Sequence, residues 1–137
     1  MSNEPILIVD DNPMNLKLER VLLEVEKYQV KTAKDAEETF QVLQHFHPRL
    51  ILMDLQLPGM DGVELAQKLK ADPLNRDIII LMVTSYALQG DEERVKKAGC
   101  DGYLHKPIDT QALPLLVAEY LRRSSKEGHN NNSTKVY

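Results

Sequence analysis

Acidic, hydroxyl and basic side chains follow four separate apolar runs of this chain. Asp10-Asp11 comes directly after one run, and Asp54 ends another. Thr84 and Lys106 come at the ends of two further runs. If these runs are parallel strands, their carboxyl ends meet at one edge of a sheet, so three carboxylates, a hydroxyl and an ammonium converge. Each residue taken singly is typical of an ordinary turn or helix cap, and only the set indicates chemistry.

Carboxylates gathered in this way repel one another unless a cation lies among them. Mg2+ prefers oxygen ligands and keeps positions open for phosphate oxygens, so the set indicates a Mg2+ site. An aspartate can accept a phosphoryl group covalently, and phosphoryl transfer requires mainly alignment and charge neutralisation. We therefore predict that Asp54 is the nucleophile and that Mg2+ and Lys106 neutralise the phosphoryl oxygens. The Thr84 hydroxyl would donate a hydrogen bond to one of these oxygens.

Short apolar runs alternate with stretches of helical spacing along the chain, which predicts strand–helix pairs. Most of the runs are rich in β-branched and aliphatic residues, as is typical of strands buried on both faces of a parallel sheet. The runs are Ile6–Val9, Gln29–Thr32, Leu50–Met53, Ile78–Val83 and Gly102–His105. Five such pairs with right-handed crossovers make a three-layer α/β sandwich.

The stretches between the runs carry apolar residues at i, i+3, i+4 and i+7, which predicts amphipathic helices. The stripes are Leu18-Val21-Leu22-Val25, Ala36-Thr39-Phe40-Leu43, Gly62-Leu65-Ala66-Leu69 and Leu113-Leu116-Val117-Tyr120-Leu121. A shorter helix is predicted around Glu92 to Ala98. Pro114 falls about one turn into the last helix, where we expect it to remove a backbone hydrogen bond or to bend the start.

The composition favours one soluble domain that does not bind nucleic acid. The chain has 137 residues and a net charge of −4, without the basic excess of nucleic-acid binders. Its single cysteine, Cys100, excludes an internal disulfide. No apolar run approaches the roughly 20 residues of a membrane helix and no secretory signal opens the chain, so we expect a cytoplasmic protein. The apolar pattern stops at Ser124, which predicts a folded domain over 1–123 and a disordered tail over 124–137.

Two strings of residues resemble the receiver domains of response regulators in two-component signalling. They are Ile6-Leu7-Ile8-Val9-Asp10-Asp11-Asn12 and Leu52-Met53-Asp54-Leu55-Gln56-Leu57-Pro58-Gly59-Met60-Asp61-Gly62. Thr84 and the pair Lys106-Pro107 complete the pattern, which spans Pro5 to about Arg123. The resemblance implies a flavodoxin-like sheet of five parallel strands in the order 2-1-3-4-5, flanked by five helices.

The resemblance also implies how the acidic residues are used. Asp11 would bind Mg2+ directly and Asp10 largely through water. Asp54 and the backbone carbonyl of Gln56 would complete the ligands from the protein. The phosphoryl donor would be a phosphorylated histidine of a sensor histidine kinase or of a histidine phosphotransfer protein.

A further implication concerns the phosphoryl-binding residues and a switch. Thr84, Ser85 and Lys106 would bind the phosphoryl group, and a cis bond between Lys106 and Pro107 would aim the lysine inward. On phosphorylation the Thr84 hydroxyl would move toward the phosphoryl group and Tyr103 would turn inward. The reporting surface would be formed by the fourth helix, the fifth strand and the fifth helix.

The lifetime of the phosphoryl group depends on how water reaches it. Tyr86 lies two residues after Thr84, where a bulky ring would shield the phosphoryl bond. Gln56 would position water on the other side. Our hypothesis is that these two residues tune the lifetime of phosphorylated Asp54.

Two classes of function fit these residues. The first is a signalling receiver without its own DNA-binding or enzymatic output, acting as a relay shuttle or as an allosteric adaptor for a downstream protein. The second is a Mg2+-dependent phosphatase with an aspartyl-phosphate intermediate. Such an enzyme usually needs a second acid close to the nucleophile, whereas Gln56 stands two residues after Asp54. A receiver that never takes up phosphate is disfavoured, because every expected site residue is present. We therefore expect a signalling domain rather than an enzyme, although one that catalyses its own phosphorylation and dephosphorylation.

Overall fold

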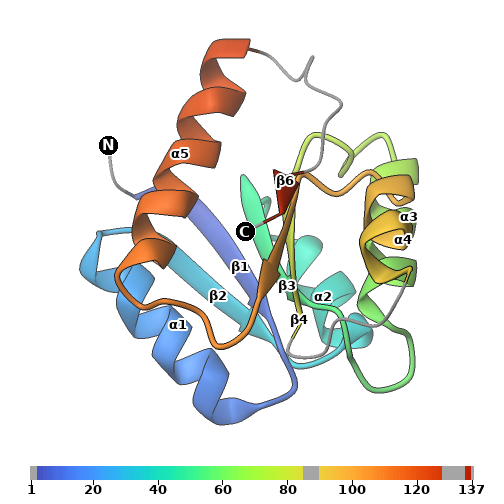
Figure 1. Ribbon diagram of the computed structural model, residues 1–137, viewed down its shortest axis with the longest axis horizontal. Helices are drawn as coiled ribbons and strands as arrows, with labels where there is room; N and C mark the ends of the chain where they lie inside the picture. The colour runs from blue at the N-terminus through green and yellow to red at the C-terminus, as the bar shows by residue number, and fades with distance from the viewer. Residues whose placement is uncertain (1–2, 85–89, 128–134, 137) are drawn as a thin grey trace.

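Strands and helices alternate along the chain (Figure 1). The computed structural model describes residues 3–84, 90–127 and 135–136, with the backbone alone for 124–127 and 135–136. The strands are β1 (Pro5–Val9), β2 (Gln29–Ala33), β3 (Leu50–Asp54), β4 (Ile79–Thr84), β5 (Gly102–His105) and β6 (Lys135–Val136). The helices are α1 (Pro13–Val25), α2 (Ala36–Leu43), α3 (Gly62–Ala71), α4 (Asp91–Lys97) and α5 (Ala112–Glu127).

The strands form one parallel sheet in the order β2-β1-β3-β4-β5-β6. The order of the first five strands confirms the predicted flavodoxin-like topology. Val9 pairs with Met53 and Thr84 pairs with His105, so the carboxyl ends of these strands lie at one edge of the sheet. The polar residues that follow the strands are thereby brought to a common edge.

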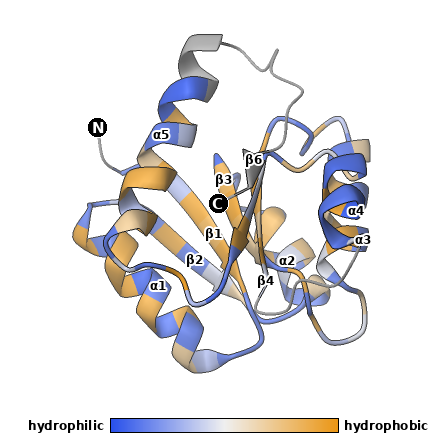
Figure 2. Ribbon diagram, viewed as in Figure 1, coloured by the Kyte–Doolittle hydropathy of each residue, from blue (hydrophilic) through white to orange (hydrophobic). Residues whose placement is uncertain are grey.

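Helices cover both faces of the sheet and make the predicted three layers. Helices α1 and α5 cover one face, and α2, α3 and α4 cover the other (Figure 1). Because successive strand residues point to opposite faces, Ile51 joins one core cluster and its neighbour Leu52 joins the other. Figure 2 shows apolar residues along β1 and β3, the strands buried between the two helix layers.

The stripe predicted for α1 is wrong, although the helix itself forms. Leu18, Val21 and Val25 are 49%, 45% and 68% exposed, whereas Leu23 is fully buried and Glu19 is 6% exposed. This helix contains so many apolar residues that more than one of its faces shows apolar residues at helical spacing. The line that contains Leu23 faces the sheet, which leaves an apolar stripe on the outer side of α1.

Pro114 disturbs α5 less than the sequence predicts, because it is only the third residue of the helix. Backbone N–H groups in a first turn mostly lack partners within the helix, so proline is tolerated there. The Asp109 carboxylate accepts hydrogen bonds from the N–H groups of Gln111 and Ala112 instead. The helix therefore begins directly after this cap.

The segment predicted as a disordered tail includes regular structure. Helix α5 continues to Glu127, past the expected boundary at residue 123, and the two residues of β6 pair in parallel with Gly102 and Tyr103 of β5. The boundary of the domain itself stays a prediction. None of the helices in the described ranges is long and apolar enough to cross a membrane.

Candidate functional site

An ammonium group lies between two buried carboxylates at the carboxyl edge of the sheet. Asp10 follows β1 and is 2% exposed, and Asp54 ends β3 and is 7% exposed. The Lys106 Nζ, from the segment after β5, lies 3.0 Å from Asp10 Oδ2 and 3.3 Å from Asp54 Oδ2. These three residues, predicted from distant parts of the sequence to converge, are thus in direct contact.

The third predicted carboxylate completes an acidic cluster. Carboxylate oxygens of Asp10, Asp11 and Asp54 lie within 4.8 Å of one another, with Asp11 exposed to solvent. The other oxygens of the buried pair accept backbone hydrogen bonds, Asp10 Oδ1 from Asn12 at 2.9 Å and Asp54 Oδ1 from Gln56 at 3.0 Å. Three carboxylates with one exposed member are a donor set that fits Mg2+, which binds oxygen ligands and retains waters.

The charges in this cluster shift the acidity of its members. Burial raises the pKa of Asp54, and the neighbouring charge of Asp10 adds to the effect, while the Gln56 N–H and Lys106 oppose it. Burial by itself would lower the pKa of Lys106. The hydrogen bond to Asp10 and the charges of both carboxylates outweigh this, so the pKa of Lys106 is raised. Lys106 is therefore a fixed positive charge at the site.

The backbone around Lys106 aims its side chain at the carboxylates. The Lys106 N–H donates to the carbonyl oxygen of Thr84 at 2.7 Å, which joins the end of β4 to the segment after β5. The peptide bond between Lys106 and Pro107 is cis, as the resemblance implies. Thr84 is fully buried, so its side chain lies in the core next to the segment that carries Lys106.

Helix α3 starts against the strand that carries Asp54. The Gly62 N–H donates to the carbonyl oxygen of Leu55 at 2.7 Å. A Cβ at Gly62 would lie 2.3 Å from the Asp54 carbonyl oxygen, so a residue without a side chain is needed there. The Asp61 carboxylate caps the helix by accepting the Glu64 N–H at 2.8 Å.

Of the four remaining predicted site residues, the structure describes two. Tyr103 is 2% exposed and already inside, and among the described residues its buried hydroxyl has no hydrogen-bond partner. Gln56 is exposed, so its side chain faces solvent beside the cluster. Ser85 and Tyr86 lie outside the described residues. The roles of these four residues stay predictions.

Sequence reasoning missed one acid near this site, Glu19 of α1. The residue is 6% exposed, and burial raises the pKa of its carboxyl group to about 7, with the charge of Asp10 as the next cause. The signal was present in the spacing, because Glu19 lies three residues after Leu16 and four before Leu23, which both contact the sheet side. An acid between apolar residues on the buried side of a helix is unusual, because acidic side chains are rarely buried.

The sequence comparison decides the family. Residues 6–118 match the family model described as the response regulator receiver domain. The chain belongs to this family. It is therefore a phosphoacceptor response regulator domain of two-component signalling. Domains of this family are signalling domains.

Relatives of this receiver support the same assignment. The polar-differentiation response regulator DivK of Brucella ovis is 39% identical over 116 residues, which cover 85% of this chain and 94% of the relative. A CheY-like receiver domain protein from Methanospirillum hungatei JF-1 has a TM-score of 0.86 and 35% identity, covering 93% of this chain and 100% of that one.

A third relative bears on the acidic cluster. The receiver domain of sensor histidine kinase PA1611 from Pseudomonas aeruginosa PAO1 has a TM-score of 0.79 and 30% identity. The alignment covers 88% of this chain and 99% of that chain. That structure has a magnesium ion coordinated in its active site cleft. The acidic cluster of the present receiver is consistent with the same ion.

Proposed function

We propose that Asp54 of this receiver accepts a phosphoryl group from the phosphohistidine of a sensor histidine kinase or a histidine phosphotransfer protein. The observation that carries the proposal is the contact of Lys106 with both Asp10 and Asp54 at a buried sheet edge. A carboxylate held against a fixed cation keeps its nucleophilic charge, and the same cation can then meet the incoming phosphoryl oxygens.

The transfer exchanges one bond to phosphorus for another. An Asp54 carboxylate oxygen attacks the phosphorus, an O–P bond forms, and the N–P bond of the phosphohistidine breaks. The electron pair stays on the imidazole nitrogen, which takes a proton from solvent. Asp54 is held for this attack because one of its oxygens accepts the Gln56 N–H and the other lies 3.3 Å from Lys106 Nζ.

Asp10, Asp11 and Asp54 would hold Mg2+, with the backbone carbonyl of Gln56 as a further ligand. When bound, Mg2+ would neutralise carboxylate and phosphoryl oxygens. The chain then needs no further protein for the chemistry, so a small phosphodonor is expected to phosphorylate it as well. Spontaneous loss of the phosphoryl group would follow from the same site, at a rate that Gln56 and Tyr86 tune.

Phosphorylation would be read out through Thr84 and Tyr103 to the surface of α4, β5 and α5. Tyr103 already occupies an inward position, so the change would be a shift in how firmly it is held there. Ser85 beside Thr84 would help bind the phosphoryl group. A downstream protein in the cytoplasm would recognise this surface, or would take the phosphoryl group onward.

The test is phosphorylation of the whole chain by acetyl phosphate in the presence of Mg2+, followed by intact mass. We expect the parent to gain one phosphoryl group and Asp54→Asn to gain none. Asp77→Asn is the matched control, because Asp77 is an exposed acid just before β4, at the opposite edge of the sheet. Equal labelling of Asp54→Asn and the parent would refute the proposal.

A further inference from the structure

Helix α1 buries an acid at its centre. Glu19 is 6% exposed and faces the sheet together with Leu23. Among the described residues its carboxyl group has neither a hydrogen bond nor an ion pair, and its oxygens are not fully sealed from solvent. Buried carboxyl groups are usually paired, because removing them from water without a partner costs free energy. The position therefore calls for a reason other than packing.

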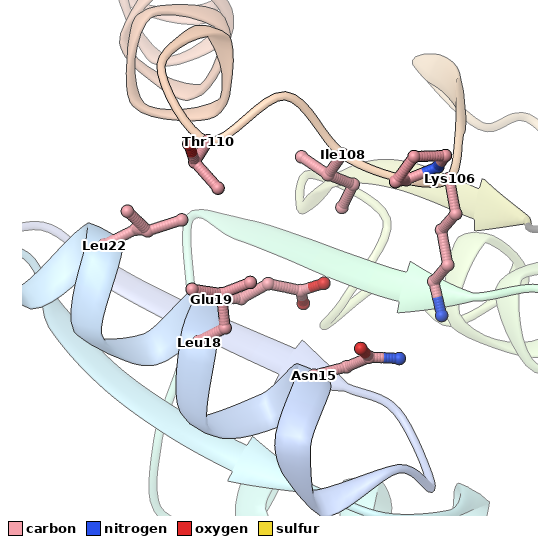
Figure 3. Close-up of a pocket in the computed structure, with 8 residues that line it drawn as sticks. Asn15, Leu18, Glu19, Leu22, Lys106, Ile108 and Thr110 are labelled. Carbon is pink, nitrogen blue, oxygen red and sulfur yellow. The ribbon is translucent and has the colours of Figure 1, made fainter.

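The Glu19 carboxyl group opens onto a cavity that it shares with Lys106. The cavity, of about 120 Å³, lies between α1 and the segment that follows β5. Its apolar lining comes from Leu18, Leu22, Pro107 and Ile108. Figure 3 shows the Glu19 carboxyl group extending from α1 in the direction of the Lys106 side chain. The acid thus lines the same cavity as the lysine that contacts Asp10 and Asp54.

Three charged groups act on Glu19 across this space. Its pKa is raised to about 7 by burial first, then by the charge of Asp10, with Asp54 adding to the effect and Lys106 opposing it. Electrostatic influence is mutual, so the charge state of Glu19 acts on those same groups. Near neutral pH a modest change in local charge is enough to change its protonation.

We propose that Glu19 is a positioning residue of the phosphoacceptor site, a fourth carboxyl group that acts through Lys106 and sets the charge of the acidic cluster. This inference rests on the proposed function, because it assigns Glu19 to the metal and phosphoryl chemistry of Asp54. When ionised, Glu19 favours a divalent cation at the cluster and attracts the Lys106 ammonium away from Asp54. When neutral, it favours the added negative charge of a phosphoryl group on Asp54.

The first test measures Mg2+ affinity by isothermal titration, without phosphodonor, for the parent, Glu19→Gln and Glu19→Leu at pH 6 and pH 8. We expect the parent to bind Mg2+ about fivefold or more tightly than either variant at pH 8. The difference should shrink at pH 6, where Glu19 is largely neutral in the parent. Glu19→Leu serves as the packing control, since it restores an apolar residue to the line of Leu23.

Two results would overturn the inference. Equal Mg2+ affinities of all three chains at pH 8 would show that the charge of Glu19 does not reach the cluster. A change in Glu19→Leu without a matching change in Glu19→Gln would assign the effect to packing. Unfolding by urea, followed for each variant, verifies that the compared chains are folded.

The second test needs neither metal nor phosphodonor, so it separates this inference from the proposed function. The Glu19 carboxyl carbon is followed by NMR as pH is varied, in the parent and in Lys106→Met. We expect titration near pH 7 in the parent and at higher pH in Lys106→Met, because the opposing cation is lost. Titration at an ordinary glutamate pH in both chains would contradict the inference, even if Asp54 is phosphorylated. Conversely, failure of Asp54 to take up phosphate would leave this result standing.

Discussion

Lys106 joins two carboxylates that would otherwise face each other in a buried site. Its ammonium lies 3.0 Å from Asp10 and 3.3 Å from Asp54, and both acids are almost fully excluded from solvent. Removing one member of such a set leaves uncompensated charge, which is far more costly than losing a surface ion pair. Lys106, Asp10 and Asp54 therefore stabilise one another as a unit.

Glu19 should make the free energy of unfolding of this chain depend on pH. Its folded pKa of about 7 lies above the ordinary value of 4.5, so the folded state binds this proton more tightly than the unfolded state. The free energy of unfolding of the parent should consequently fall as pH rises from about 4.5 through about 7. A shift of this size corresponds to at most about 3 kcal/mol.

In Glu19→Gln this side chain has no carboxyl proton to lose, so the free energy of unfolding should not show this fall. We expect only a constant offset between the two chains below about pH 4, and a gain of up to about 3 kcal/mol over that offset for the variant at pH 8. Urea unfolding at pH 4, 6, 7 and 8 measures the difference. Other titrating acids such as Asp54 are present in both chains, so a difference that does not vary with pH would contradict the assignment.

At the scale of elements, the rotation of α1 decides which residues support the site. The helix turns Glu19 and Leu23 toward the sheet and leaves Leu18 and Val21 on its outer side. Glu19 can reach the cavity beside Lys106 only in this rotation. The helix also starts at the turn that holds the acids, because the Asn12 side chain accepts the N–H groups of Met14 and Asn15.

The rotation of α1 can be tested by truncating one residue on each side of the helix. Leu23→Ala should cost about 2–5 kcal/mol of stability, because it leaves a cavity in a buried cluster. Leu18→Ala should cost less, about 1 kcal/mol, because Leu18 is 49% exposed. Urea unfolding of both variants at one pH makes the comparison. A greater loss for Leu18→Ala would restore the stripe predicted from the sequence.

At the scale of the whole molecule, the arrangement could be predicted where the apolar runs and the polar residues at their ends indicate the same fold. Buried parallel strands are continuous apolar runs, and βαβ crossovers have one hand, so the three layers and the shared edge of Asp10, Asp54 and Lys106 follow from the sequence. The order of the strands followed only from the resemblance to receiver domains. The rotation of α1 did not follow, because its apolar residues satisfy more than one stripe. Glu19 was missed for the same reason, and β6 because two residues carry no strand signal.

Asp54 is the proposed phosphoryl acceptor of this receiver. The most direct measurement is to phosphorylate the whole chain with acetyl phosphate and Mg2+, reduce the acyl phosphate with borohydride, and locate the altered residue by peptide mass spectrometry. We predict a single altered residue at position 54, lost when Mg2+ is chelated before the phosphodonor is added. Modification at Asp10, at Asp11 or at any other residue, with Asp54 unchanged, would contradict the account.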